Sequence, residues 1–259
     1  MEAVRINKFL SDRGICSRRE ADRLVEAGKI LVDGKPVVMG QKITPDQEII
    51  VDGKKVEKQD APVLIKFYKP KGIVCTSSRE EKDNIIDFIK YPVRIYPVGR
   101  LDKNSEGLIL LTNQGELMDR ILRGSNYHEK EYIVHVNRRI TDDFIRHMSE
   151  GVEILDQMTR SCEVERINNY TFRIVLTQGL NRQIRRMCEA LDYHVTRLKR
   201  IRVMNIRIDG LERGTYKNVS DSEWKELKRL LEGKQKWNQN KKETINSYSR
   251  KTGKHPSHR

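Results

Sequence analysis

Apolar residues in the first 56 positions recur first at helical spacing and then at strand spacing. Two stretches, Ile6 to Leu10 and Ala21 to Val25, carry them at the i, i+3, i+4 intervals of a helix face. Ser17 and Glu20 precede the second stretch in the order of a capping box, in which each side chain binds the other residue's backbone amide. Apolar residues on either side of an Asp-Gly pair in residues 30–38 indicate a hairpin. This pattern predicts a small helical pair with a small sheet.

Between residues 63 and 232, short apolar runs alternate with polar turns, and expected strands outnumber expected helices. Leu108 to Thr112 is continuously apolar, which is typical of a strand buried on both faces. The mixture predicts an α+β fold with a central, mostly antiparallel mixed sheet and flanking helices. Strands are expected at residues 63–68, 73–76, 94–98, 128–136, 159–164, 171–176, 195–201 and 203–208, and helices at 84–89 (capped by Asp83), 116–123, 141–148 (capped by Thr141), 182–191 and 221–231 (capped by Asp221).

Composition divides the chain into four parts. Residues 58–62 are polar and end in a proline, which indicates a linker between an N-terminal domain of residues 1–57 and a larger domain of residues 63–232. The last part, residues 233–259, carries eight Lys or Arg against one acid and almost no apolar residues. A segment of this composition cannot bury a core, so we expect a disordered basic tail.

Positive charge dominates the chain and gathers on the two predicted N-terminal helices. The net charge of the 259 residues is +14, which indicates a polyanionic partner such as RNA. A solvated basic face is the alternative explanation for the same cluster. The candidate phosphate contacts in it are Arg5, Lys8, Arg18, Arg19 and Arg23.

Several classes of chemistry lack their sequence signatures. The four cysteines form no C-x-x-C pair and have no histidine at zinc-ligand spacing, so neither a disulfide framework nor a zinc site is expected. The chain has no dinucleotide-binding, P-loop or H-E-x-x-H motif, and we therefore expect no cofactor and no metal. Without an apolar run of about 18 residues or a signal-peptide core, we expect a cytoplasmic protein with no membrane partner.

Asp102 lies in a tight polar loop between two expected strands. Arg100 and Lys103 flank it, and the apolar run from Leu108 follows shortly after. A carboxylate held by a sheet next to cationic side chains is a candidate catalytic group. The alternative is an ordinary loop aspartate that caps a backbone amide.

The first domain resembles the S4 RNA-binding module. The resemblance rests on Arg-Ile-Asn-Lys-Phe-Leu at residues 5–10, on residues 14–22 with their Cys-Ser-Arg-Arg-Glu core, and on Gly-Lys-Ile-Leu-Val-Asp-Gly at residues 28–34. It implies a compact helical pair and a small sheet of the type called α-L, which docks on structured RNA.

Four further segments together resemble one family of enzymes. They are Lys-Pro-Lys-Gly at residues 69–72, Gly-Arg-Leu-Asp at 99–102, Lys-Glu-Tyr at 130–132 and the Gln-Gly-Leu-Asn-Arg-Gln-Ile-Arg-Arg segment within 178–189. In this order, behind an S4 module, they resemble the ribosomal RNA pseudouridine synthases of the RsuA family. The sequences of the first helix pair and of the segment within 178–189 are most similar to those of the branch called RluF, which acts on the large subunit. The resemblance spans roughly residues 4–230.

The resemblance implies that a uridine in large-subunit ribosomal RNA is flipped out of its stack and isomerised to pseudouridine, without a cofactor. Asp102 matches the family's catalytic aspartate; whether it attacks the sugar or deprotonates C2′ stays open. Arg185 matches the basic residue that would hold this carboxylate in a bidentate pair, with a phosphate contact as the alternative. Tyr132 matches the tyrosine that stacks on the target base, with packing inside a sheet as the alternative.

The remaining candidates surround these three residues. Ile184 and Leu176 would line the pocket, although ordinary core packing explains them equally well. Arg100 would take the place of the flipped nucleotide or bind its phosphate, as the resemblance implies. Arg182 and Arg186 are candidates for phosphate contacts.

Two competing functions remain open from the sequence. One is a non-catalytic RNA-binding or ribosome-assembly factor with a degenerate catalytic domain, against which the intact set of Asp102, Tyr132 and Arg185 argues. The other is a pseudouridine synthase of the same family that acts on small-subunit ribosomal RNA. Transfer RNA stays open as an additional substrate, and a monomer is expected.

Overall fold

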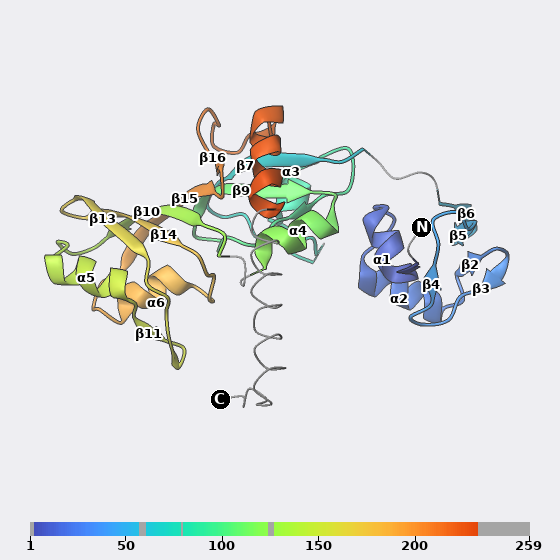
Figure 1. The fold of residues 1–259 in the computed structure, drawn as a ribbon, viewed down its shortest axis with the longest axis horizontal. Helices are drawn as coiled ribbons and strands as arrows, with labels where there is room; N and C mark the ends of the chain where they lie inside the picture. The colour runs from blue at the N-terminus through green and yellow to red at the C-terminus, as the bar shows by residue number, and fades with distance from the viewer. Residues whose placement is uncertain (1–2, 57–60, 79, 124–126, 233–259) are drawn as a thin grey trace, which may run out of the picture.

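The computed structural model describes residues 3–56, 61–78, 80–123 and 127–232 (Figure 1). We call residues 3–56 the N-terminal unit and residues 61–232 the C-terminal unit. Most of the expected linker and all of the expected tail at 233–259 lie outside the described residues, so the proposed domain boundaries stay predictions. Among the described residues, no helix is long and apolar enough to cross a bilayer.

The N-terminal unit packs two helices against two small antiparallel sheets. The core of the unit buries Ile6 and Leu10 from the first helix and Ala21 from the second. One sheet has the strand order β3-β2-β5-β6, and the other pairs β1 with β4. The elements are β1 (Val4–Arg5), α1 (Ile6–Asp12), α2 (Arg18–Glu26), β2 (Ile30–Val32), β3 (Lys35–Pro36), β4 (Lys42–Ile43), β5 (Ile49–Val51) and β6 (Lys54–Lys55).

The C-terminal unit is built on one long mixed sheet. Its strand order is β13-β14-β10-β15-β9-β7-β17, with β16 paired to β15 and β8 paired to β9. All pairs are antiparallel except that between β15 and β9, which confirms the predicted α+β fold with a mostly antiparallel mixed sheet. The strands of this sheet are β7 (Leu64–Lys69), β8 (Tyr96–Pro97), β9 (Glu106–Thr112), β10 (Lys130–Val136), β13 (Glu163–Asn168), β14 (Thr171–Leu176), β15 (Val195–Val203), β16 (Ile206–Arg207) and β17 (Tyr216–Asn218). A separate antiparallel pair is formed by β11 (Glu153–Ile154) and β12 (Gln157–Met158).

Helices cover both faces of this sheet. Strand β9 is buried on both sides, as predicted: Leu108 and Leu110 pack in the cluster that contains α4, whereas Ile109 and Leu111 pack in the cluster that contains α3. A separate core joins β10 and β14 to α5 and α6. The helices are α3 (Ile85–Ile89), α4 (Gly115–Leu122), α5 (Asp142–Glu150), α6 (Gln183–Glu189) and a final helix over residues 221–232.

The parallel contact between β9 and β15 joins the two halves of the sheet, and it depends on a glycine. Gly107 pairs with Arg200 and has φ of +115°, a value that L side chains rarely adopt. A Cβ atom at this position would lie 2.2 Å from the Arg200 carbonyl oxygen. Arg200 also pairs with Tyr132 of β10 on its other side, so the close approach places the loop before β9 and Tyr132 on either side of β15. This arrangement positions the site described below.

Helix caps show where local sequence signals were sufficient and where they were not. Thr141 caps α5, as predicted, because its Oγ1 accepts a hydrogen bond from the Phe144 amide at 3.1 Å. At α2, Ser17 Oγ accepts from the Glu20 amide at 3.1 Å, but the Glu20 carboxylate pairs with Arg23. Only the first half of the predicted capping box is therefore confirmed.

Two predicted caps and two strand boundaries are wrong. Asn84 rather than Asp83 caps α3, since its side chain accepts from the Asp87 amide. Ser220 rather than Asp221 caps the last helix, where it forms a reciprocal capping box with Glu223. The strand expected at 73–76 is reduced to a single bridge between residues 74 and 84, and the strand expected at 159–164 lies instead at Glu163–Asn168.

Candidate active site

The loop of residues 99–105 is held from two sides before it enters β9. The Ser105 amide donates to the Asp102 carbonyl at 3.0 Å, which closes the loop on itself. The Gly72 amide donates to the Lys103 carbonyl at 2.8 Å, so the Lys-Pro-Lys-Gly turn braces the loop from outside. These contacts fix the backbone that carries the Asp102 carboxylate.

Lys69 supports the same turn from inside the protein. Its side chain is fully buried, and its Nζ donates to the carbonyl oxygens of Pro70 at 2.8 Å and Ile73 at 2.7 Å. Burial lowers the pKa of Lys69, and the nearby Asp102 carboxylate opposes that effect. The sequence identified Lys69 as part of a motif, but its hydrogen bonds to the turn could be seen only in the folded protein.

The Arg185 side chain is held beside the loop by three hydrogen-bond acceptors. It lies on α6 and is 9% exposed. Its guanidinium donates to the carbonyl of Val195 at 3.1 Å, to Ser105 Oγ at 3.2 Å and to the carbonyl of Asn104 at 3.5 Å. Both terminal nitrogens are thus engaged, and the side chain has little freedom to move.

The remaining nitrogen of this guanidinium faces the candidate carboxylate. Nε of Arg185 lies 3.7 Å from Oδ2 of Asp102, and this buried Nε has no hydrogen-bond partner among the described residues. The predicted bidentate pair is therefore wrong, because the terminal nitrogens bind elsewhere. Burial lowers the pKa of Arg185, with a further lowering by Arg182 and an opposing effect from Asp102. What remains is an ion pair through a single nitrogen.

Arg182 also lies beside the carboxylate, where the sequence predicted a phosphate contact. Its Nη1 is 3.6 Å from Asp102 Oδ2. Arg182 immediately precedes α6 in the left-handed conformation, with φ of 50°. By contrast, Arg186 donates from Nε to the Asn181 carbonyl at 3.1 Å and from Nη2 to its side chain at 3.3 Å. The structure thus separates two arginines that the sequence treated alike.

One pocket brings most of the candidate residues together. Tyr132 reaches it from β10. Leu176 and Ile184 line the pocket and are also buried in the core, so the pocket-lining role and the core-packing role both apply to them. Leu198 and Gln183 complete the wall. The predicted residues that line the pocket are Arg100, Asp102, Tyr132, Leu176, Arg182, Ile184 and Arg185.

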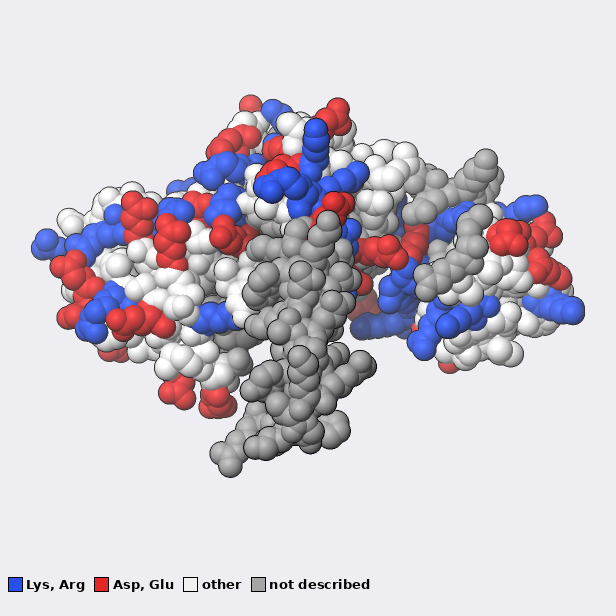
Figure 2. Space-filling view, in the orientation of Figure 1, with Lys and Arg blue, Asp and Glu red and all other residues white. Residues whose placement is uncertain are grey.

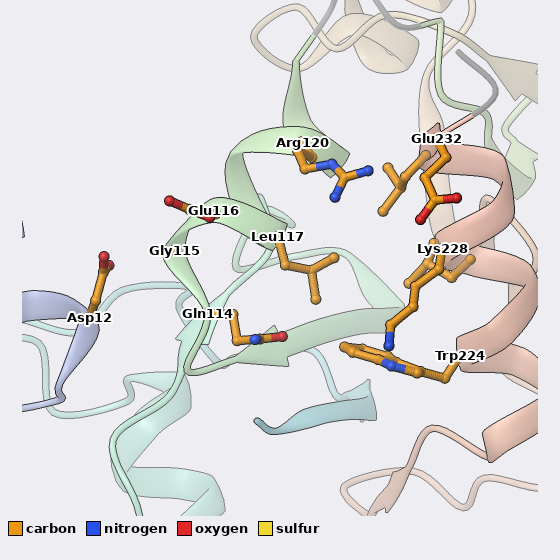
Figure 3. A pocket seen from close by; sticks show the side chains of 11 residues that line it. Asp12, Gln114, Gly115, Glu116, Leu117, Arg120, Trp224, Lys228 and Glu232 are labelled. Atoms are coloured by element: carbon orange, nitrogen blue, oxygen red, sulfur yellow. The ribbon is translucent and has the colours of Figure 1, made fainter. Parts of the chain in front are cut away.

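A larger hollow elsewhere does not hold this set. It lies against α4 and the last helix, where Leu117 and Arg120 face Trp224 and Lys228 (Figure 3). None of the predicted site residues lines it. The Asp102 pocket, by contrast, holds an acid, an aromatic ring and three arginines that the sequence predicted for the active site.

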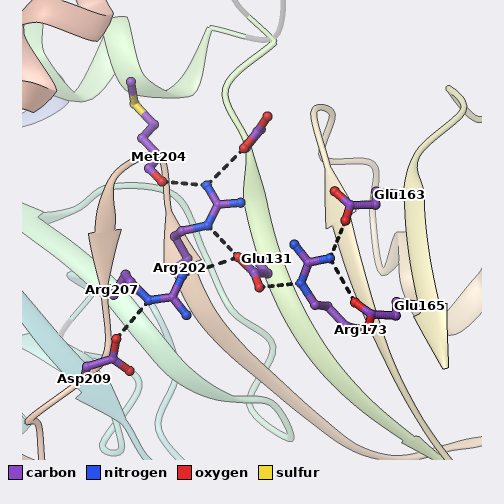
Figure 4. Close-up of polar contacts among 9 residues, drawn as sticks. Glu131, Glu163, Glu165, Arg173, Arg202, Met204, Arg207 and Asp209 are labelled. Atoms are coloured by element: carbon purple, nitrogen blue, oxygen red, sulfur yellow. Dashed lines mark hydrogen bonds and ion pairs between the residues drawn. The ribbon is translucent and has the colours of Figure 1, made fainter. Parts of the chain in front are cut away.

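On the strand that carries Tyr132, a buried carboxylate binds arginines from neighbouring strands (Figure 4). Glu131 is 5% exposed and accepts from Arg173 Nε at 2.7 Å and from Arg202 Nε at 2.5 Å, with Arg207 at 3.8 Å. Burial would raise the pKa of Glu131, but the hydrogen bonds from Arg202 and Arg173 outweigh it and hold the pKa below its ordinary value.

The Glu131 cluster fixes strand β10 from the side opposite the pocket. Successive residues of a strand face opposite sides of the sheet, so Glu131 ties β10 to β14 and β15 behind Tyr132. Sequence reasoning missed this role. Glu131 belongs to the Lys-Glu-Tyr motif, but its partners lie 42 and 71 residues away.

The predicted phosphate contacts of the N-terminal unit divide into two groups. Arg5, Arg18, Arg19 and Arg23 are exposed, although Arg23 also pairs with a neighbouring acid on its own helix. Lys8 instead donates to Glu116 at 2.7 Å and so links α1 to α4 of the C-terminal unit. Figure 2 shows Lys and Arg side chains on the part of the N-terminal unit next to the C-terminal unit.

Comparisons with known proteins show the family of this chain. The family model for RNA pseudouridylate synthase matches residues 63–190, and the S4 domain model matches residues 4–49. The dual-specificity RNA pseudouridine synthase RluF of Salmonella typhi is 48% identical over 233 residues, which are 89% of this chain and 81% of that protein. RluF of Escherichia coli K12 is 48% identical over 232 residues, with 89% and 80% covered.

More distant relatives show the same pattern. The ribosomal large subunit pseudouridine synthase B of Bacillus subtilis is 32% identical over 237 residues, which cover 88% of this chain and 97% of that protein. A crystal structure of a pseudouridylate synthase superposes with a TM-score of 0.64 at 25% identity, and it covers 88% of this chain and 99% of that one.

Proposed function

Because this chain belongs to the RNA pseudouridine synthase family with an N-terminal S4 domain, we propose that its substrate is a uridine of large-subunit ribosomal RNA. The relatives named for the large subunit, together with the RluF proteins, support this choice of RNA. The observation that carries the site assignment is the convergence of Asp102, Tyr132 and Arg185 on one pocket from three separate segments of the chain.

The reaction leaves the composition of the nucleotide unchanged, because the proton lost from C5 to solvent is balanced by one that N1 takes up. The bond between C1′ of the ribose and N1 of uracil breaks, the base turns, and a bond forms between C1′ and C5. The proton leaves C5, and N1 of the rearranged base carries a proton. The base must first leave its stack, which costs a few kcal/mol and least where it is unpaired. An unpaired uridine is therefore the preferred target.

The three residues take distinct parts in this scheme. The Asp102 carboxylate acts on the ribose, as a nucleophile at C1′ or as a base at C2′, and both routes need it ionised. Arg185 places a fixed positive charge beside this carboxylate, with its buried Nε 3.7 Å from Oδ2. Tyr132 stacks on the flipped base, and its hydroxyl assists removal of the C5 proton.

The pocket wall serves the same chemistry. One side of the pocket is apolar and is formed by the buried side chains of Leu176, Ile184 and Leu198. These side chains have no group that could hydrogen-bond to water. Water at the reacting carbon would release the base instead of rejoining it through C5. A wall of this kind excludes that side reaction.

We further propose a transfer RNA as a second substrate of this chain, which the dual-specificity name of the RluF relatives supports only in calling for two RNA substrates. The exposed arginines of the N-terminal unit bind phosphates of either RNA, because such contacts carry little sequence information. Incubation of the purified chain with unmodified transfer RNA checks this point separately from the ribosomal substrate.

The decisive experiment maps pseudouridine in ribosomal RNA by carbodiimide chemistry in a strain that lacks the gene. One large-subunit pseudouridine is expected to disappear and to return with the wild-type gene. Asp102→Asn is expected not to restore it and to show no turnover in a tritium-release assay, while its RNA affinity stays within a few-fold of wild type. The matched control is Asp119→Asn, an exposed acid on α4 outside the pocket, which is expected to restore it.

Other outcomes would change the assignment. A complete modification map in the deletion strain would favour an RNA-binding or assembly factor over an enzyme acting on this RNA. A missing pseudouridine in the small subunit would show that the large-subunit part is wrong. Turnover by Asp102→Asn would remove Asp102 from the catalytic role.

A further inference from the structure

The Asp102 carboxylate has two arginine partners, and they are held very differently. The Arg185 side chain is 11% exposed and is anchored by three protein acceptors. The Arg182 side chain is 44% exposed, and among the described residues its guanidinium meets no acceptor other than Asp102. One partner is thus fixed and the other is free to leave.

The charges at the pocket favour such a departure. Two guanidinium groups share one carboxylate, so the three side chains carry a net charge of +1 and the two cations repel each other. The lowering of the Arg185 pKa by Arg182 reports this repulsion. A phosphate group would remove the excess charge and offers a guanidinium two parallel hydrogen bonds.

The Asp102–Arg182 pair is also weak enough to exchange. Its side chains are 35% and 44% exposed, and the atoms are 3.6 Å apart, beyond hydrogen-bond distance. Exposed ion pairs of this kind contribute only about 0.2–1 kcal/mol. A charge-assisted contact with RNA therefore competes with it successfully.

We propose that Arg182 pairs with Asp102 in the free enzyme and moves to a phosphate beside the flipped nucleotide when RNA binds. Arg185 stays in place. The carboxylate then keeps its fixed partner and loses the exposed one, which opens the side of Asp102 that faces the entering ribose. The inference rests on the proposed function, because it takes RNA as the ligand of this pocket.

A double-mutant cycle on RNA binding tests the exchange. The ligand is a short transcript centred on the uridine mapped above, with pseudouridine already in place, so that no variant turns it over. Affinities are measured for wild type, Asp102→Asn, Arg182→Gln and the double variant. Asp102→Asn is expected to bind about 1.4- to 5-fold tighter than wild type, because Arg182 no longer has to be released. This gain is expected to vanish in the Arg182→Gln background.

The salt dependence gives a second readout. If Arg182 binds a phosphate in the complex, Arg182→Gln reduces the slope of log K against log salt by roughly 0.7–0.9. Arg182→Lys keeps the charge but not the planar fork, so it is expected to retain the slope with weaker binding. The matched control is Arg186→Gln, since Arg186 binds Asn181 and not Asp102. In that background the Asp102→Asn gain is expected to persist.

The outcomes separate this inference from the proposed function. Equal gains from Asp102→Asn with and without Arg182 would show simple relief of repulsion between Asp102 and RNA, and would overturn the exchange. An unchanged salt slope would overturn it as well. If the wild-type chain forms no pseudouridine in the unmodified transcript, the proposed function fails first. Melting curves of all variants identify any loss of binding that comes from unfolding.

Discussion

Nε of Arg185 lies 3.7 Å from Oδ2 of Asp102, while the terminal nitrogens of the same guanidinium bind Val195 and Ser105. The guanidinium is therefore a rigid reference point rather than a mobile counter-ion. It ties helix α6 to the loop before β9, and it places one positive charge at a constant distance from the carboxylate. Several consequences of this geometry and of the surrounding sheet are measurable.

Replacement of Arg185 is expected to cost more activity than replacement of Arg182. Arg185→Ala removes the fixed charge beside Asp102 and leaves buried acceptors unpaired, so we expect a loss of about 10²-fold or more in single-turnover rate. Arg182→Ala is expected to act mainly through weaker RNA binding and to raise KM. Tritium release under single-turnover and steady-state conditions separates the two effects. Equal losses in single-turnover rate would show that the ion-pair partner is misassigned.

Two substitutions of Tyr132 are expected to separate the stacking of its ring from the chemistry of its hydroxyl. Tyr132→Ala removes a ring whose stacking contributes about 1–3 kcal/mol per base, which corresponds to roughly 5- to 150-fold in affinity for the RNA. Tyr132→Phe keeps the ring, so RNA affinity should stay near wild type while turnover falls. Filter binding and tritium release on the same RNA measure both quantities. A Phe variant that loses affinity as strongly as the Ala variant would contradict a stacking role.

Glu131 is expected to act on the reaction through its neighbour. Glu131→Gln removes the buried carboxylate shared by Arg173 and Arg202, and breaking a buried pair costs about 3–5 kcal/mol of unfolding free energy. The partners that remain, Glu163 and Glu129, are exposed acids. Displacement of β10 should also lower turnover through Tyr132. The control is Glu165→Gln, an exposed acid 3.6 Å from Arg173, which should change neither property measurably. Urea unfolding with a parallel activity assay tests the pair, and similar effects of both variants would refute the distinction.

Gly107 is expected to be far less tolerant of substitution than a glycine in a surface turn. In Gly107→Ala the new Cβ would meet the Arg200 carbonyl at 2.2 Å, and the backbone contact cannot relax without parting β9 from β15. A loss of about 3 kcal/mol or more in unfolding free energy is expected. Gly34→Ala also has positive φ but meets nothing within 4 Å, so only about 1 kcal/mol should be lost. Equal losses in urea unfolding would show that steric contact at β15 is unimportant.

Lys130 is expected to make stability rise with pH in the alkaline range. Burial, with a smaller contribution from Arg200, lowers the pKa of Lys130 to about 8, below its ordinary value of 10.5. The unfolded chain therefore holds this proton up to a higher pH than the folded one. As a result, the unfolding free energy increases between pH 8 and 10.5, and below pH 8 the folded state carries the full cost of the buried charge.

Lys130→Met removes that cost. The variant should exceed wild type by up to about 3 kcal/mol in unfolding free energy at pH 7, and the difference should shrink toward zero as pH approaches 10.5. Urea unfolding of both proteins at several pH values isolates this group, because all other titrations cancel in the difference. A constant difference across the range would argue against a buried charge.

Much of the architecture could be predicted from local patterns because the interactions involved are local. The Thr141 cap acts within three residues, and the continuous apolar run from Leu108 indicates a strand that is buried on both faces. The errors are also local: Asn84 stands one position after Asp83, the residue that the sequence favoured, and Ser220 stands one position before Asp221. Adjacent cap-forming residues compete, and the turn geometry chooses between them.

Hydrophobic spacing and motifs in a given order were sufficient to predict the α+β fold, the family and seven of the residues that line the pocket. How those residues are paired could be read only from the folded protein. Arg182 and Arg186 are one helical turn apart, but a left-handed backbone at Arg182 directs it to Asp102 while Arg186 binds its own loop. Glu131 acquires its arginines through strand register. Pairings of this kind depend on how distant strands meet in the sheet, and periodicity along the chain does not specify that register.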